Sequence, residues 1–588
     1  MRIPRPADLT PGVGPEAVAV LARAGLLRPS RPDRLLASAL AFVRWGVTPV
    51  AGYAVAAARF PDEPAVIDDA GTVTFAALHR RAAAIAAGLA ELGVGEGTRV
   101  GLLCRNHRGM VEACIATGRL GGDVVLLNTG FAAPQLAAVL RAERVRVLVH
   151  DEEFTEVAEQ AAGRRRRVLA WHDLPTRRPT LDGLAAEHDG EDPPAPGRTG
   201  RVVILTSGTT GTPKGAERSK PGGIDTAVAL LSRIPFRSRE TTLVAAPLFH
   251  AWGFANLMLG TLLSSTIVLQ RRFDPAETLS ATARHRANSL VAVPVMLQRL
   301  LELPEPVRAA RRAPSLRIVA VSGSALSPTL STRFMDAYGD VLHNLYGSTE
   351  VGWAAIATPE DMRAAPGTVG RPPHGTVVRL LDERGNEVAP GASGRIFVGS
   401  SLVFEGYTGG GDKERIDGLA ATGDIGRFDD AGRLFVEGRD DEMIVSGGEN
   451  VFPAEVEDVL SRHPDVSDVA VIGVEDAEFG QRLAAWVVAR DGARIDPERL
   501  RGHVRAHLAR YKVPRDIHVV DELPRNPAGK VLKRVLAESA AKPPKAAAGA
   551  PKPKATAGAP KPKAGAPTAK ATAGKTRRPA TGARTGRR

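Results

Sequence analysis

A strand-like apolar segment that runs directly into a loop of hydroxyls, glycines and one lysine constrains this chain most. Residues 202–205 read VVIL and residues 206–215 read TSGTTGTPKG. Glycines allow backbone N–H groups to turn toward an anion, hydroxyls add donors, and lysine adds a compact positive charge. Because Pro213 precedes Lys214 and Gly215 follows it, the segment departs from the Walker pattern. It predicts a phosphate-binding loop of a different kind, with a flexible surface turn as the alternative.

Helical and strand-like patterns alternate along most of the chain. Residues 75–92 are alanine-rich with helical spacing, 99–103 are strand-like, 107–120 are helical and 124–127 are strand-like. This alternation predicts an α/β fold with a large layered N-terminal domain. From residue 370, short strands with glycine-containing turns predict a β-rich subdomain. After residue 439, a separate set of helices and strands predicts a small α+β C-terminal domain.

These patterns divide the chain into four segments. We expect an N-terminal helical extension at 1–59, a large domain at 60–439, a small domain at 440–540 and a tail at 541–588. Residues 35–58 are apolar but interrupted by Arg44, Gly46, Pro49 and Gly52, which favours a packed helical cap or a shallow membrane-surface contact over a spanning helix. The tail repeats Ala, Lys, Pro, Gly and Thr and has no large apolar residue, which predicts disorder.

The net charge of +13 belongs to the tail. Residues 541–588 contain 8 Lys, 5 Arg and no acidic residue, so 65 of the 78 basic residues remain in the body, together with all 65 acidic residues. The body is therefore neutral. Cys104 and Cys114 are too few for a disulfide scaffold or a Cys-rich zinc site, and residues 1–14 lack the apolar core of a signal peptide. We expect a cytoplasmic protein, with peripheral membrane attachment left open.

Four further motifs follow the loop along the chain. Residues 346–350 read YGSTE, 422–424 read TGD, 438–441 read GRDD and 526–530 read NPAGK. Each of them alone is more typical of a turn or of ordinary packing. Together and in this order, they resemble the adenylate-forming (AMP-binding) superfamily of acyl-CoA synthetases, luciferases and peptide-synthetase adenylation domains. The resemblance covers residues 50–540 and is closest in texture to bacterial fatty-acyl-CoA synthetases.

The resemblance implies a site for ATP and Mg²⁺. Glu350 is the implied Mg²⁺ ligand, for which a hard carboxylate is apt. Tyr346 would stack on adenine, and Asp424 would accept hydrogen bonds from the ribose hydroxyls with Arg439 nearby. The expected nucleotide-binding residues are Thr206, Ser207, Gly208, Thr209, Thr210, Lys214, Gly323, Ser324, Ala325, Asn344, Tyr346, Gly347, Thr349, Glu350, Asp424, Arg439 and Lys530.

The resemblance also implies two half-reactions in two conformations. Lys530, with Thr206 and Glu350, is expected to catalyse adenylation, because two anions meet as the carboxylate attacks the α-phosphate. The C-terminal domain would then rotate about a hinge that matches Asp441 and bring in a loop containing Gly447 and Gly448, where the arm of CoA passes close to the backbone. Lys512 is expected to face CoA or the acyl-adenylate.

The acid to be activated is predicted from residues 247–254, PLFHAWGF. This segment matches the acyl-pocket segment of the superfamily, and it holds no acidic side chain that could pair with the ammonium group of an amino acid. His250 and Trp252 are the expected substrate contacts, although His250 could equally be a packing residue. We expect a medium- or long-chain fatty acid. An aryl acid, or transfer to a carrier protein instead of CoA, remains the alternative.

The basic tail has two interpretations. Thirteen cations in 48 residues could bind nucleic acid or anionic lipid through counterion release, or could form a solubilising extension. Either property would be accessory to an enzyme, because the neutral body offers no element that reads a nucleic-acid groove. Whether the chain forms a homodimer is left open.

Overall fold

The computed structural model describes residues 14–27, 31–46, 48–206, 214–217, 224–311, 313–404, 406–407, 412–446, 449–476, 480–527 and 529–540. The chain divides into two units, Met1–Ala540 and Ala541–Arg588. All described residues belong to the first unit, so the predictions for the tail fall outside them. No described helix combines the length and the apolar composition that crossing a bilayer requires.

Three helices form the N-terminal segment, and each begins with proline in its first turn, where a missing N–H costs nothing. The side chain of Thr48 caps the third by accepting a hydrogen bond from the N–H of Ala51. This third helix packs against the body of the protein through the buried side chains of Val50 and Tyr53. The helices are α1 (Pro15–Arg23), α2 (Pro32–Trp45) and α3 (Pro49–Arg59).

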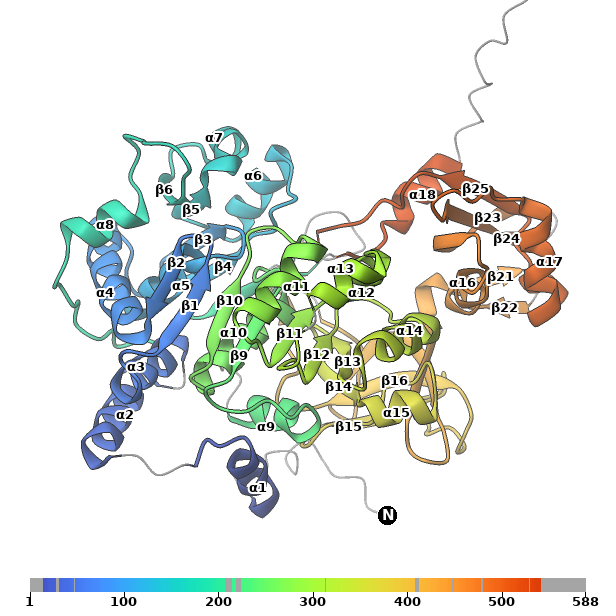
Figure 1. The fold of residues 1–588 in the computed structure, drawn as a ribbon, viewed down its shortest axis with the longest axis horizontal. Coiled ribbons are helices and arrows are strands. Elements are labelled where there is room, and N and C mark those ends of the chain that lie inside the picture. Colours follow the sequence, from blue (N-terminus) through green and yellow to red (C-terminus); the bar gives the residue numbers. More distant parts are fainter. Residues whose placement is uncertain are drawn as a thin grey trace, which may run out of the picture. The chain divides into compact units, whose positions relative to one another are not determined.

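A seven-stranded sheet contains the strand that precedes the predicted phosphate loop. Its order is β17-β8-β7-β4-β3-β5-β6, and the pairs from β7 to β6 are parallel. Helices α4, α5 and α8 pack together beside it (Figure 1). The strands are β3 (Arg99–Leu103), β4 (Asp123–Leu126), β5 (Val147–Asp151), β6 (Arg166–Trp171), β7 (Val202–Thr206), β8 (Lys214–Glu217) and β17 (Gly406–Tyr407). The helices that follow these strands are α5 (Arg108–Arg119), α6 (Ala133–Ala142), α7 (Thr155–Ala162) and α8 (Leu181–Glu187), with the 3₁₀ turn η2 (Glu152–Phe154).

An eight-stranded sheet forms the second layer, in the order β14-β13-β12-β11-β9-β10-β1-β2. All neighbours are parallel except the pairs β1/β2 and β13/β14 at the two edges. Its strands are β1 (Pro64–Asp68), β2 (Gly71–Thr74), β9 (Thr241–Val244), β10 (Thr266–Leu269), β11 (Ser289–Ala292), β12 (Ile318–Val321), β13 (Leu342–Ser348) and β14 (Gly352–Ala357). The helices that precede or follow these strands in the sequence are α4 (Phe75–Glu91), α9 (Ile224–Arg233), α10 (Ala251–Leu262), α11 (Pro275–Arg284), α12 (Pro294–Glu302), α13 (Glu305–Ala310), α14 (Pro328–Tyr338) and α15 (Pro359–Ala364).

Short antiparallel strands follow, as the change of texture at residue 370 predicts. They form a five-stranded sheet in the order β15-β16-β19-β18, with β20 paired to β19. The last pair brings residues 424–428 opposite residues 434–439. The strands are β15 (Val377–Leu381), β16 (Gly394–Gly399), β18 (Arg415–Ile416), β19 (Leu419–Phe428) and β20 (Leu434–Arg439).

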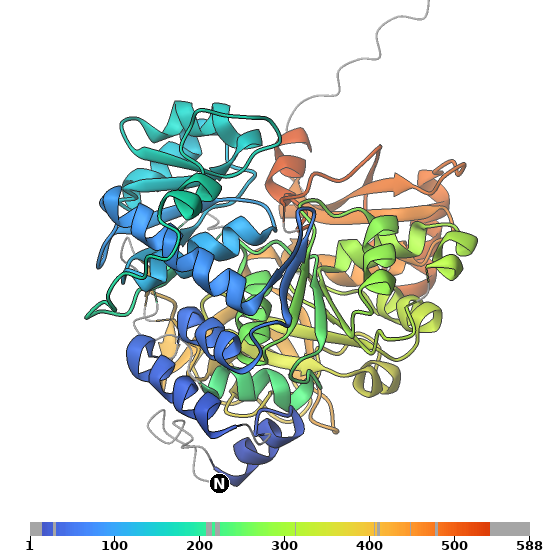
Figure 2. The same ribbon diagram turned by 60° about the vertical axis from the view of Figure 1, so that its left-hand side comes forward.

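The C-terminal elements, drawn in orange and red in Figures 1 and 2, have a sheet and a core of their own. The sheet order is β22-β21-β24-β23, with β25 paired to β24. These observations confirm the predicted α/β fold with a large layered domain, a β-rich subdomain and a small α+β domain. The elements are η3 (Asp440–Glu442), β21 (Ile444–Ser446), β22 (Glu449–Val451), α16 (Pro453–Ser461), β23 (Val466–Asp476), β24 (Gly480–Ala489), α17 (Pro497–His507), η4 (Arg510–Lys512), β25 (Asp516–Val520) and α18 (Lys533–Ala540).

Candidate active site

The register of the eight-stranded sheet places several predicted site segments at one edge. Val244 on β9 is opposite Val291 on β11, and the next residue of β11, Ala292, is opposite Val321 on β12, which is in turn opposite Asn344 on β13. Because these strands are parallel, their carboxyl ends meet at the same edge, which is where ligands bind in open α/β sheets. The segments that leave the four strands there are 245–250, 293, 322–327 and 349–351.

Two of these segments carry predicted nucleotide residues. Gly323 follows β12 with φ of +97°, a conformation that favours glycine, and Ser324 and Ala325 come directly after it. Asn344 and Tyr346 lie on β13, next to β12, and Asn344 is buried. The fold therefore brings the predicted adenine-binding residues from two distant parts of the sequence to adjacent strand ends.

Tyr346 and Asp424 form the central contact of the site. The hydroxyl of Tyr346 donates a 2.5 Å hydrogen bond to Oδ2 of Asp424 across 78 residues of sequence. Asp424 and Arg439 are opposite each other on β19 and β20, and Nη1 of Arg439 lies 3.9 Å from Oδ1 of Asp424. The three predicted residues are thus brought together by the pairing of β19 with β20 and its approach to β13.

Burial decides the electrostatics of this contact. Burial raises the pKa of Asp424, and the Tyr346 hydroxyl and the positive charges of Arg439, Lys413 and Lys530 oppose that rise. Burial and the neighbouring carboxylate of Asp424 raise the pKa of Tyr346 well above its usual range. Tyr346 is therefore a hydrogen-bond donor throughout the physiological pH range, and it supports the ionised form of Asp424.

Lys413 is a neighbour of Asp424 that the sequence analysis did not assign. Gly423, with φ of +85°, precedes Asp424, and a Cβ added to it would lie 3.5 Å from Nη2 of Arg439 and 3.8 Å from Nζ of Lys413. The only sequence signal for Lys413 is that lysine is rare in the body of this arginine-rich chain. Lys413 lies on the loop before β18, and the folding of the β-rich sheet brings this loop close to Asp424.

Glu350 lies in the turn between β13 and β14 and is held from two sides. The hydroxyl of Tyr407 donates a 3.1 Å hydrogen bond to its Oε1, and the N–H of Phe404 donates a 2.8 Å bond to its backbone carbonyl. Tyr407 on β17 pairs with Ala216 on β8, two residues after Lys214. Glu350 thereby lies next to the strand that continues the phosphate loop. Burial, followed by the charge of Glu350, raises the pKa of Tyr407 to about 12.

Tyr407 was missed by the sequence analysis, because 57 residues separate it from Glu350 and no local pattern links the two. The neutral hydroxyl of Tyr407 orients the carboxylate of Glu350 without neutralising its charge. Glu350 therefore keeps the kind of oxygen ligand that Mg²⁺ prefers. The donor set around Glu350 therefore fits the predicted metal role.

Lys530 ends a tight turn that three interactions stabilise. The N–H of Asn526 donates to the carbonyl of Lys530, and the N–H of Lys530 donates to Oδ1 of Asn526, both at 2.9 Å. Arg525 donates from Nη1 to the carbonyl of Gly529 at 2.6 Å. The Lys530 side chain is exposed, and its charge acts on Asp424. This turn therefore presents the predicted catalytic lysine toward the nucleotide residues.

Gly529 has little room beside the large domain. Its φ is +82°, and an added Cβ would lie 2.5 Å from Cγ1 of Val295 at the start of α12. Nearby, Nε2 of Gln298 on the same helix donates a 2.8 Å hydrogen bond to the carbonyl of Ser467. The glycine before Lys530 is thus required both by its backbone conformation and by close approach.

The predicted acyl segment begins α10. His250 precedes the helix, its ring packs against Phe249 with centroids 4.5 Å apart, and burial lowers its pKa to about 4. Its Nε2 is buried and has no hydrogen-bond partner among the described residues. The indole N–H of Trp252, in contrast, donates a 3.1 Å bond to the carbonyl of Ala292. Trp252 therefore joins α10 to β11, and only its ring remains for the substrate contact predicted for it.

Lys512 is paired with an acidic side chain of the C-terminal elements. It lies on η4, and its Nζ forms a 2.6 Å ion pair with Oε2 of Glu455 on α16. Its expected contact with CoA or the acyl-adenylate stays a prediction. Several other predicted residues lie outside the description. Ser207, Gly208, Thr209, Thr210, Gly447 and Gly448 are not described, and of Thr206, Lys214 and Asp441 only the backbone is.

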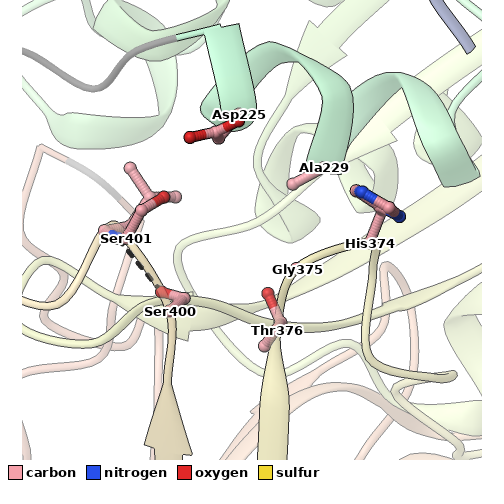
Figure 3. Close-up of a pocket in the computed structure, with 8 residues that line it drawn as sticks. Asp225, Ala229, His374, Gly375, Thr376, Ser400 and Ser401 are labelled. Carbon is pink, nitrogen blue, oxygen red and sulfur yellow. Dashed lines mark hydrogen bonds between the residues drawn. The ribbon is translucent and has the colours of Figure 1, made fainter. Parts of the chain in front are cut away.

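Two other features of the described residues are separate from this site. Figure 3 shows a hollow lined by α9 and the loops before β15 and after β16, and none of the predicted residues lines it. Cys104, His107 and Asp151 place potential metal-ligating atoms within 4.8 Å of one another in the core. Nε2 of His107 already lies 2.7 Å from Oδ1 of Asp151, and Oδ2 accepts a 2.8 Å bond from the N–H of Arg105. We interpret this cluster as a buried hydrogen-bond network.

Comparison with known proteins decides the family. The AMP-binding enzyme family matches residues 53–408, and the AMP-binding enzyme C-terminal domain matches residues 455–530. This chain belongs to the AMP-binding enzyme family. The predicted superfamily is thereby confirmed.

The relatives of this AMP-binding enzyme include acid–CoA ligases. It is 37% identical over 485 residues to a feruloyl-CoA synthase from an Amycolatopsis species, covering 81% of this chain and 96% of that protein. It is 36% identical over 487 residues to 2-succinylbenzoate–CoA ligase from Geobacillus kaustophilus, covering 81% and 95%. A fatty acid–[acyl-carrier-protein] ligase from Streptomyces coeruleorubidus is 30% identical over 497 residues, covering 81% and 93%.

A solved structure shows the same arrangement of the chain. The o-succinylbenzoate CoA synthetase from Bacillus subtilis, in complex with its acyl-adenylate intermediate, superposes with a TM-score of 0.72 at 28% identity, covering 82% of this chain and 97% of that one. The protein is accordingly an AMP-forming acid–CoA ligase that works through an acyl-adenylate and uses ATP, Mg²⁺ and CoA. The expected resemblance to fatty-acyl-CoA synthetases is not specifically supported, since feruloyl-CoA synthase and 2-succinylbenzoate–CoA ligase are named for other acids.

Proposed function

We propose that this enzyme activates an aromatic carboxylic acid of the hydroxycinnamic type and transfers it to CoA. The observation that carries the proposal is the 37% identity to a feruloyl-CoA synthase over 96% of that protein. The predicted acyl segment agrees with it. Phe249 and Trp252 supply aromatic surface, and the buried Nε2 of His250 lacks a partner in the described protein, as expected of a group that meets a polar substituent of a ligand.

The proposed first half-reaction joins two anions. When bound, ATP supplies the adenylyl group and Mg²⁺ offsets the phosphate charge. Glu350, oriented by Tyr407, holds the metal, and Asp424, supported by Tyr346, accepts hydrogen bonds from the ribose hydroxyls. Lys530 offsets negative charge between the attacking carboxylate and the α-phosphate, and pyrophosphate leaves. In the second half-reaction the CoA thiol attacks the acyl carbonyl and AMP leaves.

A substrate panel tests the acid. We expect kcat/KM for ferulate and related cinnamates to exceed that for decanoate or palmitate by at least about tenfold, because even a small mismatch between an acid and its binding site costs about 1–3 kcal/mol. AMP release and thioester mass are the readouts. A higher kcat/KM for fatty acids would contradict the proposal of an aromatic substrate and support the fatty-acid substrate expected from the sequence. ADP as a product would contradict the adenylate mechanism.

The acceptor is tested in parallel. The 30% identity to a fatty acid–[acyl-carrier-protein] ligase gives a second candidate, in which a fatty acyl group passes to a carrier protein. Offering a preformed acyl-AMP pool to CoA and to carrier proteins separates the two. We expect turnover with CoA, and turnover with a carrier protein alone would favour the second candidate.

Two variants test the proposed roles of Lys530 and Asp441. Lys530→Ala should slow pyrophosphate exchange by raising its activation barrier by about 2.7–4 kcal/mol, which is the cost of removing one preorganised donor. The same variant should still form the thioester from supplied acyl-AMP. Asp441→Pro should show the reverse pattern, because proline removes the backbone freedom that a hinge requires. Equal loss of both half-reactions in either variant would refute the role assigned to that residue.

A further inference from the structure

Helix α2 is packed with its apolar side outward. Ser38 and Ala41 are only 8% and 5% exposed, whereas Leu36, Leu40 and Val43 are 63%, 58% and 84% exposed. At 3.6 residues per turn, these two sets fall on opposite faces of the helix. In Figures 1 and 2, α3 lies on one side of α2 only.

The outward side is a continuous apolar face. Leu35 and Phe42 are exposed beside Leu36, Leu40 and Val43, and we call these five residues the α2 face. They are five of the thirteen large apolar side chains that are exposed among the described residues. A clustered patch of this kind on a helix marks a surface that contacts something apolar, whereas single exposed leucines are ordinary.

The helix is anchored firmly enough to present this face in one orientation. Trp45, at its end, has the guanidinium carbons of Arg44 and Arg119 at 4.4 Å and 5.0 Å from its ring centroid. Nη1 of Arg44 also lies 3.3 Å from a carboxylate oxygen of Asp192, and Nη1 of Arg34 donates a 2.5 Å hydrogen bond to the carbonyl of Arg59. The polar contacts are thus made at the inner side and at the ends, which leaves the α2 face free of them.

Charge identifies the partner. Residues 1–59 contain 8 Arg against 3 acidic residues, and the tail adds 13 cations without an acid. Residues 60–540 then hold 57 basic and 62 acidic residues, so the positive charge is concentrated in the two terminal segments. A second copy of the chain would bring two positively charged segments together, whereas an anionic lipid surface would attract both segments.

We propose that α2 lies in the interface of an anionic membrane, with the α2 face inserted among the acyl chains. Fourteen residues are too few to cross a bilayer but suffice for a helix in the interface plane. The combination of an apolar insertion with a polybasic segment supplies the two signals that stable peripheral binding requires.

Vesicle sedimentation of the full chain tests this proposal. Protein is mixed with vesicles of phosphatidylcholine alone or of phosphatidylcholine with phosphatidylglycerol, at low and at raised salt. The test variant is the triple substitution Leu36→Ser, Leu40→Ser and Val43→Ser. The matched control is Leu174→Ser, Val519→Ser and Val535→Ser, three apolar side chains that are also exposed but lie away from α2.

We expect the wild type to partition onto the anionic vesicles and the test variant to partition at least about tenfold less, because three apolar side chains that leave water on insertion are replaced by polar ones. The control should stay within about twofold of the wild type, since its side chains do not reach the membrane. Raised salt should weaken binding of the wild type without erasing the difference between wild type and test variant, because insertion of the α2 face is not screened.

Three results would overturn the proposal. One is a wild type that does not bind anionic vesicles, and another is a test variant that binds as well as the wild type, which would assign binding to the basic tail alone. The third is a wild-type dimer in light scattering that becomes monomeric in the test variant, which would make the α2 face a contact between copies. Ligase turnover in solution is measured on all three proteins, because an unchanged rate shows that the substitutions leave the fold intact.

Discussion

Tyr346→Phe tests the central contact of the site with the smallest change. It removes only the hydroxyl that donates the 2.5 Å hydrogen bond to Asp424. A bond of this length to a carboxylate is charge-assisted, and such bonds contribute about 1.5–3 kcal/mol. If Asp424 must be ionised to accept from the ribose hydroxyls, the same free energy should appear as a loss of roughly tenfold to a hundredfold in kcat/KM for ATP.

The pH dependence gives this prediction a sign. Burial raises the pKa of Asp424 and the Tyr346 hydroxyl opposes that rise, so the substitution should raise the pKa further. Activity that needs the carboxylate is lost as pH falls through the folded-state pKa, and the acidic limb of the kcat/KM profile should therefore move to higher pH in the variant.

Stability should change in the opposite direction along the pH axis. A carboxyl group whose pKa is raised on folding keeps its proton to a higher pH in the folded state than in the unfolded state. The free energy of unfolding therefore falls as the pH rises from the unfolded-state pKa through the folded-state pKa. The loss of unfolding free energy in Tyr346→Phe should accordingly be largest near neutral pH and narrow below the folded pKa of Asp424. Urea unfolding at several pH values measures it.

The matched control is Tyr338→Phe. The hydroxyl of Tyr338 is buried on α14 and has no hydrogen-bond partner in the part of the chain that the structure describes, so its removal should leave kcat/KM and its pH profile unchanged. An acidic limb that stays in place in Tyr346→Phe, or that moves equally in both variants, would show that this hydrogen bond does not support the ionised state of Asp424.

Three further predictions concern residues around this contact. Tyr407→Phe removes the donor 3.1 Å from Glu350, and we expect the Mg²⁺ concentration for half-maximal adenylation to rise by about tenfold; an unchanged Mg²⁺ titration would contradict the role of Tyr407. Gly529→Ala places a Cβ 2.5 Å from Val295 at φ of +82°, so pyrophosphate exchange should fall by about tenfold or more, and a wild-type rate would mean that this turn does not position Lys530. Burial lowers the pKa of His250 to about 4, so wild type and His250→Asn should have the same profile shape between about pH 5 and 8, and a limb present only in the wild type would refute a neutral His250.

Much of the fold was predictable because it follows local patterns. The alanine-rich segment 75–92 forms α4, which begins where Thr74 accepts a hydrogen bond from the N–H of Ala77 and Phe75 turns into the core. The change of texture at residue 370 marks the antiparallel strands. Periodicity did not show which side of α2 would face outward, because an apolar stripe is compatible with a core or with an external partner.

The site was predictable as a set of residues and only in part as a set of contacts. Motif order indicated Tyr346, Glu350, Asp424 and Lys530 together. The ion pair of Lys512 with Glu455 and the hydrogen bond of Trp252 to Ala292 were not predictable, since each joins elements that are distant in the sequence. The expected fatty acid was inferred from general texture, which says less about a pocket than similarity over a whole relative does.

By itself, the sequence determined the reaction class and the layers of the fold, because glycines, hydroxyls and apolar periodicity act within a few residues of one another. Only the tertiary structure decided which groups share a proton or a charge. Sheet order and register bring Tyr346 to Asp424 across 78 residues and Tyr407 to Glu350 across 57. Those distances depend on the packing of the whole chain, and burial at the resulting contacts then sets the pKa of each group.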